Sequence, residues 1–132
     1  KAGFVALQNY TWGGDYRVEK FANRYWISYV GGALKGYETD PLSIGMAWSE
    51  TLTGAHPWHR LPRAVLSPVQ EDVRYWEKLT LYKSNIIHDR ERLLGWPFVM
   101  FYNAKTNSGY ERIGIAVSDD MQHWRRYGWW HG

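Results

Sequence analysis

The sequence contains no cysteine, which excludes a disulfide framework, a thiolate metal site and a thiol nucleophile. It has no run of about 18 apolar residues, the length that a membrane-spanning helix needs. It also has no basic start followed by an apolar stretch of signal-peptide type. At 132 residues we expect one soluble globular domain or a piece of one. Secretion, or export to the periplasm, after removal of a signal stays open.

The sequence also lacks a concentrated charge. It has 16 Lys and Arg against 13 Asp and Glu, a net charge of +3, and its basic residues are scattered along the chain. Neither nucleic acid nor a membrane is therefore expected as a partner, and binding to another polyanion is the weakest of the functions considered.

Aromatic side chains are abundant instead. The chain has nine Trp, ten Tyr and four Phe, together 17% of its residues. Such large flat side chains pack on sheet faces, and they also stack on sugar rings, whose C–H faces are apolar. Composition alone leaves both uses open.

The two ends of the sequence carry no signal of a domain boundary. The chain starts at Lys1 without a methionine and finishes on Trp129, Trp130, His131 and Gly132, with no capping residue or polar tail. These ends lead us to expect a segment of a longer protein.

An internal repeat organises the sequence. Residues 43–50, SIGMAWSE, match residues 112–119, RIGIAVSD, and Ile44 lies 69 positions before Ile113. Three further pairs of blocks match in the same order: 17–18 with 86–87, 25–30 with 97–102, and 58–60 with 124–126. Two copies of one structural unit therefore follow each other.

Each block is short, rich in β-branched and aromatic residues, and bounded by turn-forming residues, which predicts strands. The first repeat is expected to form strands at 16–21, 24–30, 42–48 and 58–61, and the second at 85–88, 98–102, 112–117 and 123–127. A tight hairpin is expected at 21–24, and helix only as a turn near 69–76. Four antiparallel strands repeated at this period predict an all-β fold of two β-propeller blades.

The predicted blades are residues 1–68 and residues 69–132, both parts of one propeller domain. Two blades alone leave sheet faces uncovered. Either the chain is part of a ring whose remaining blades lie in a longer parent chain, or copies assemble as a homo-oligomer. Two copies would supply four blades, and three would supply six.

Several motifs go beyond the blade pattern: Gly-Asp-Tyr-Arg-Val at 14–18, the aromatic run at 25–29, and Ile-Gly-x-Ala-x-Ser at 44–49 and again at 113–118, followed by Asp119-Asp120 and His123-Trp124. Together they resemble the five-bladed β-propeller glycosidases, the superfamily of glycoside hydrolase families 43 and 32 and the family 130 mannoside phosphorylases. The resemblance spans nearly the whole chain, about two blades.

The resemblance implies that chemistry takes place at the start of the innermost strand of successive blades, around a central funnel. Asp15 stands where phosphorylase-like members carry the acid of an Asp-Pro-Arg-Val element, with Tyr16 in place of Pro. Asp15 is therefore the candidate general acid or orienting carboxylate. The corresponding place in the second repeat has no acid, although glycoside hydrolysis normally needs two carboxylates. The other would come from another blade, another copy, or phosphate in a phosphorylase.

The candidate sugar-binding residues are aromatic or polar neighbours of these two strand starts: Trp12, Tyr16, Arg17, Lys83, Ser84 and Asn85. The aromatic rings would stack on sugar, and the polar groups would hydrogen-bond to hydroxyls. Structural roles are the alternatives: a turn at Asp15, an ion pair of Arg17 with Asp15 or Glu19, and core packing of the rings.

Other residues that carry chemistry receive structural interpretations. His88 and Asp89 are expected at the far end of their strand, and Glu111 in a salt bridge. His56 and His59 are expected on an outer strand, where a metal site is not expected, and no cofactor is expected either. The sequence thus predicts a carbohydrate-active propeller that cleaves or binds a glycan, inactive as an isolated pair of blades. The alternative is a propeller that binds sugar or self-assembles without catalysis.

Overall fold

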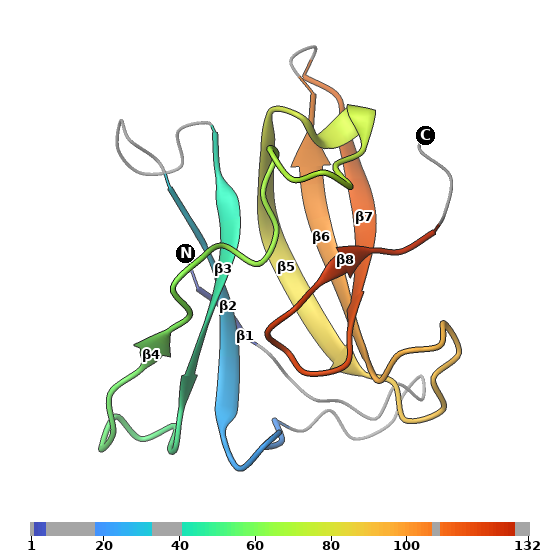
Figure 1. The fold of residues 1–132 in the computed structure, drawn as a ribbon. Coiled ribbons are helices and arrows are strands. Elements are labelled where there is room, and N and C mark those ends of the chain that lie inside the picture. Colours follow the sequence, from blue (N-terminus) through green and yellow to red (C-terminus); the bar gives the residue numbers. More distant parts are fainter. Residues whose placement is uncertain (1, 5–17, 33–40, 107–108, 129–132) are drawn as a thin grey trace.

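The structure, a computed structural model, describes residues 2–4, 18–32, 41–106 and 109–128. Its elements in chain order are β1 (Ala2–Phe4), β2 (Tyr25–Gly31), β3 (Ser43–Ser49), β4 (His59–Arg60), the 3-10 helix η1 (Tyr75–Glu77), β5 (Thr80–His88), β6 (Phe98–Lys105), β7 (Glu111–Ser118) and β8 (Arg125–Arg126). The strands form two four-stranded antiparallel sheets, in the orders β1-β2-β3-β4 and β5-β6-β7-β8 (Figure 1).

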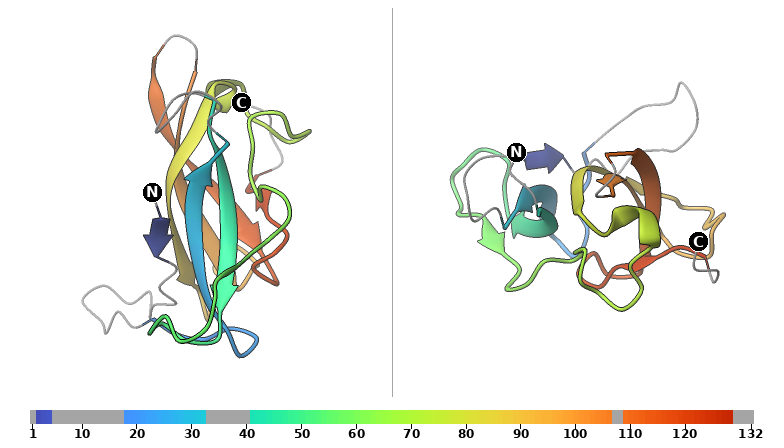
Figure 2. Two further views of the ribbon diagram at one scale, coloured as in Figure 1. Left: turned by 90° about the vertical axis from the view of Figure 1, so that its left-hand side faces the viewer. Right: turned by 90° about the horizontal axis from the view of Figure 1, so that it is seen from above.

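The two sheets lie side by side and follow the chain order of two propeller blades, as Figure 1 and Figure 2 show. The predicted fold class is confirmed: the described chain is all-β, with two four-stranded blades in an open arrangement. Apolar side chains from both sheets meet between them, including Trp26 and Met46 from the first and Ile86 and Met100 from the second. Burial of these side chains joins the blades into one unit.

The strand predicted at 16–21 is wrong. Among the described residues of that range, 18–20 form no strand, and Phe21 makes only an isolated bridge with Arg24. The edge of β2 is occupied instead by β1, with Ala2 opposite Tyr29 and Phe4 opposite Ile27. Because a strand edge pairs with one neighbour, β1 takes the place expected for the later segment.

The predicted hairpin turn at 21–24 is confirmed. The backbone amides of Phe21 and Arg24 each donate to the other residue's carbonyl, over 2.8 and 3.1 Å. Ala22 and Asn23 between them both have positive φ, 53° and 64°, as a type I′ turn requires. The helical turn expected near 69–76 is present as η1, and no helix of the described residues is long and apolar enough to cross a membrane.

A buried charge network attaches the connection between the blades to the second sheet. The side chain of Arg126 is 1% exposed and that of Glu77 is fully buried, and Arg126 Nε donates to Glu77 Oε1 over 2.6 Å. The other carboxylate oxygen of Glu77 accepts from the Tyr102 hydroxyl over 2.8 Å, and Arg126 also pairs with Asp72 over 2.9 Å. Burial and the neighbouring Glu77 carboxylate raise the pKa of Tyr102, which keeps its phenol protonated.

Candidate functional site

Polar side chains gather at one end of the second blade, where β5 begins, β6 ends and β7 begins. Tyr82 lies opposite Asn103 in the β5–β6 ladder, and Asn103 lies opposite Ile113 in the β6–β7 ladder. One position pair further along, Lys105 lies opposite Glu111. Because directly paired residues share a sheet face, these five side chains stand on one face. We call this end the polar end of the second blade.

Hydrogen bonding and charge define the polar end. The Tyr82 hydroxyl donates to Glu111 Oε1, and the ammonium groups of Lys83 and Lys105 lie 5.8 and 6.0 Å from the centre of the Tyr82 ring. Asn103, Glu111 and Ile113 line a shallow hollow of about 550 Å³. The polar end therefore presents a carboxylate, an amide and two ammonium groups around an aromatic ring.

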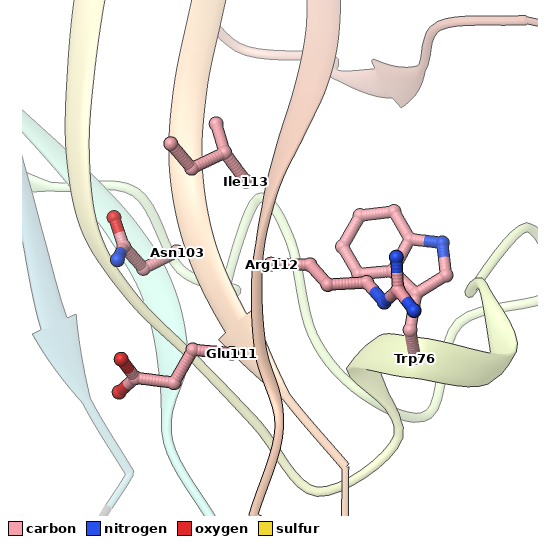
Figure 3. Close-up of a pocket in the computed structure, with 5 residues that line it drawn as sticks. All are labelled: Trp76, Asn103, Glu111, Arg112 and Ile113. Carbon is pink, nitrogen blue, oxygen red and sulfur yellow. The ribbon is translucent and has the colours of Figure 1, made fainter.

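Trp76 and Arg112 line the same hollow from the other side of β7. Figure 3 shows the Arg112 side chain extending toward the Trp76 ring, while Asn103 and Glu111 lie across the strand from them. Strand alternation explains the arrangement, since Glu111 and Arg112 are neighbours in the chain and point to opposite faces. The hollow thus surrounds the first residues of β7.

A β-bulge at Lys83 sets which side chains of β5 face the polar end. The register shifts between Tyr82 and Ser84, and Lys83 has a positive φ of 45°, a strained conformation for a residue with a side chain. Without the bulge, Tyr82 and Ser84 would share a face. With it, Tyr82 turns toward Glu111, and Ser84 turns toward the first blade.

The three predicted binding residues of β5 therefore do not converge. Ser84 Oγ donates to Ser28 Oγ across the blade interface over 2.6 Å, whereas Asn85 is exposed on the opposite face, beside Phe101. Lys83 is the member of the set that lies beside Tyr82. The prediction that they open the strand is wrong, because β5 begins at Thr80 and places them in its interior.

The remaining predicted site residues, Trp12, Asp15, Tyr16 and Arg17, lie outside the described residues. Their roles stay predictions. Glu19, which is described, pairs with Arg90 of the second blade over 2.5 Å.

Residues that received structural interpretations mostly have structural contacts. Asp89 is 4% exposed and accepts from the backbone amides of Glu91 and Leu93. His88 packs on Phe98 at the end of β5 away from the polar end, with ring centres 5.0 Å apart. Burial and the Arg90 charge lower the pKa of His88, against the opposing effect of Glu19. These contacts hold a loop and a core edge.

The two histidines of the 56–59 stretch also have separate partners. The His59 ring stacks on Trp48 at 4.2 Å, and His56 Nε2 lies 3.3 Å from Glu50. Within the described ranges, no three His, Asp or Glu side chains are grouped as a metal site needs.

Sequence reasoning missed most of the polar end. Tyr82, Asn103, Lys105 and Trp76 were not among the expected site residues, and Glu111 hydrogen-bonds to a tyrosine as well as lying opposite Lys105. One signal could have found Tyr82: the strand pattern of aromatic and β-branched residues continues back to Thr80. Extending β5 brings Tyr82 beside the ends of β6 and β7.

Two solved structures share this fold. One, described as "Glycoside hydrolase", has 40% sequence identity and a TM-score of 0.78, and the match covers 95% of this chain and 38% of that chain. The other, described as a complex of BT0996 and RGII, has 39% identity and a TM-score of 0.78 over the same shares. The chain therefore has a glycoside-hydrolase-like fold and spans about two-fifths of the length of each structure that it matches. No protein-family model and no curated protein matches the sequence.

Proposed function

We propose that the chain supplies two blades of a carbohydrate-active β-propeller that acts as a glycoside hydrolase, of the five-bladed superfamily that its motifs resemble. The observation that carries the proposal is the 40% identity over 95% of this chain to a structure described as a glycoside hydrolase. Identity at that level over both blades extends beyond the general requirements of a sheet scaffold. Families 43, 32 and 130 are the candidate relatives.

The polar end of the second blade is the proposed glycan-binding surface. Glu111 accepts hydrogen bonds, Lys83 and Lys105 donate them, and Asn103 does both, as sugar hydroxyls require. Trp76 adds an aromatic face for stacking on the C–H side of a sugar ring. The bond from Tyr82 orients the Glu111 carboxylate, which limits the conformational entropy that Glu111 loses when a sugar binds.

Asp15 is the proposed general acid, which protonates the glycosidic oxygen as the bond to the leaving sugar breaks. Trp12, Tyr16 and Arg17 are the proposed sugar contacts beside it. A water activated by a second carboxylate, or phosphate in a phosphorylase, would attack the anomeric carbon. We propose that another blade or copy supplies that carboxylate.

A second function is sugar binding without hydrolysis. It is favoured by one observation: Lys83, Ser84 and Asn85 occupy the place in the second repeat that Asp15 holds in the first, and none of them is an acid. A single carboxylate orients a sugar but does not provide both acid and base.

The test compares binding and turnover in the same preparation. Binding is measured on a glycan array and by calorimetry with the best oligosaccharide, and turnover with aryl glycosides, with and without phosphate. Glu111→Gln should weaken binding about tenfold, since a charged hydrogen-bond acceptor is lost. Glu91→Gln is the matched control, an exposed glutamate in the loop after β5. Equal binding by both variants would contradict the proposed surface.

Asp15→Asn separates the two functions. Hydrolysis predicts a loss of turnover of at least about 100-fold with binding retained, and Asp119→Asn, a matched exposed aspartate, should keep full activity. Binding by the unsubstituted chain without any turnover would favour the non-catalytic function. Neither binding nor turnover by the assembled protein would overturn both.

A further inference from the structure

The two blades pack through unlike faces. The first blade contributes the face that holds Trp26, Ser28, Ile44 and Met46, which we call its receiving face. The second blade contributes the face that holds Ser84, Ile86, Phe98, Met100 and Tyr102, which we call its docking face. The Ser84–Ser28 hydrogen bond and the edge-to-face contact of Phe21 with Phe98, with ring centres 4.6 Å apart, cross this interface.

The repeat gives each blade a counterpart of both faces. Tyr29 lies opposite Gly45 in the first blade, and Tyr102 lies opposite Gly114 in the second. From these pairs the equivalent positions follow, and the receiving face of the second blade consists of Phe101, Asn103, Ile113 and Ile115. The docking face of the first blade consists of Tyr25, Ile27 and Tyr29.

Both of these counterparts are uncovered in the single chain. On the receiving face of the second blade, Ile113 is 70% exposed and Phe101 is 39% exposed. On the docking face of the first blade, Tyr25, Ile27 and Tyr29 are all partly exposed. Adjacent exposed Ile and Phe side chains on one sheet face are typical of an interaction surface.

We propose that the receiving face of the second blade binds the docking face of the first blade in a second copy of this chain. The argument is the internal interface, in which a docking face of the same repeat already lies on a receiving face. One chain carries both free halves, so each copy can dock on the next in the same direction. Such a head-to-tail contact repeats until the ring closes.

The polar end lies on the same face as this contact. Asn103 and Ile113 belong both to the receiving face and to the hollow, and Tyr82 and Glu111 adjoin them. A docked copy would therefore form one wall of the polar end. This consequence rests on the proposed function, whereas the assembly itself does not.

Two single variants test the direction of the contact. Ile113→Lys places a charge on the receiving face, and Ile27→Lys places one on the docking face. We expect the unsubstituted chain to form a closed oligomer, and each variant alone to be a monomer, by light scattering coupled to size exclusion. Val69→Lys, at a position that is 91% exposed and belongs to neither face, should assemble normally.

Mixing the two variants gives the decisive result. Each retains the face that the other has lost, so an equimolar mixture should form a one-to-one dimer and nothing larger. A monomeric unsubstituted chain at about 100 times the concentration of a micromolar interface would overturn the proposal, and would be expected if blades of a longer chain cover the face. Variants that remain oligomeric, or that fail to recombine, would also overturn it.

Circular dichroism and thermal unfolding establish that each variant is folded before its mass is interpreted. If Ile27→Lys unfolds, Tyr25→Lys tests the same face. Glycan binding is measured separately, so failure to assemble and failure to bind sugar are distinguishable outcomes.

Discussion

The ring of Tyr102 on β6 lies directly over Gly114 on β7, so that a Cβ at Gly114 would come 2.6 Å from the tyrosine hydroxyl. The first blade repeats the arrangement, with Tyr29 over Gly45 and a corresponding distance of 2.7 Å. Real Cβ atoms essentially never approach so closely. The glycine of the repeated Ile-Gly-x-Ala-x-Ser motif is therefore required by a tyrosine on the neighbouring strand.

Gly114→Ala should destabilise the fold by about 1–3 kcal/mol, the usual cost of forcing an extra methyl into a filled space. The cost is increased where Tyr102 cannot move, because its hydroxyl is bound to the buried Glu77. Gly31→Ala is the matched control, since its nearest neighbour would be an ordinary 3.5 Å away. Urea unfolding measures both, and equal stability of the two variants would contradict this explanation of the motif.

The Arg126 network gives a second stability prediction. Arg126→Met leaves the fully buried Glu77 carboxylate without its positive partner, so we expect a loss of about 3–5 kcal/mol in the free energy of unfolding. Adding Glu77→Gln should recover part of that loss, because the uncompensated charge is removed. Denaturant unfolding of the two single variants and the double variant checks this, and purely additive losses would argue against a coupled pair.

Asp120 gives a pH-dependent prediction. Burial alone would raise its pKa, but hydrogen bonds from His123, Gln122 and Ser118 outweigh it and lower the pKa to about 2. A lowered pKa contributes stability that is present above the ordinary value of 3.8 and is lost as the pH falls through about 2. We therefore expect Asp120→Asn to be less stable than the unsubstituted chain above the ordinary pKa, and the difference to disappear as the pH falls through about 2.

The effect should be modest, because the Asp120 side chain is 45% exposed and solvent screens its interactions. Thermal unfolding across this pH range measures it. Asp119→Asn, at the exposed neighbouring position, serves as the control. A stability difference between Asp120→Asn and the unsubstituted chain that did not change with pH would contradict the assignment.

The repeat allowed the blades to be predicted because identical packing needs leave similar residues at equivalent places. Gly45 and Gly114, each beneath a tyrosine, are the most direct example. The position of β1 could not be predicted in this way, because Ala-Gly-Phe at 2–4 carries almost no strand signal. Its pairing is decided by the free edge of β2.

The candidate site was predictable only in part. Lys83 was expected there and lies there, but the turning of Ser84 away from it depends on a bulge that no glycine marks. The Tyr82–Glu111 bond joins residues 29 positions apart, so it follows from the alignment of three strands. Short motifs specify a blade, whereas side-chain convergence depends on register.

Lys83 finally allows stability and function to be separated. Its φ of 45° lies in the left-handed region, which costs a residue with a side chain about 1–2 kcal/mol. Lys83→Gly should relieve this strain and stabilise the fold by about 0.5–1 kcal/mol, while removing an ammonium group from the polar end. If the polar end binds glycan, affinity should fall several-fold as the melting temperature rises.

Asn23→Gly is the control for that experiment, because Asn23 also has a positive φ, 64°, in the hairpin turn of the first blade. It should relieve strain without changing glycan affinity. Strain that persists at Lys83 is then explained by the binding that its side chain provides, since residues in unfavourable conformations are retained where function requires them. A Lys83→Gly variant that is both more stable and equally good at binding would remove Lys83 from the proposed surface and leave its bulge with the task of orienting Tyr82.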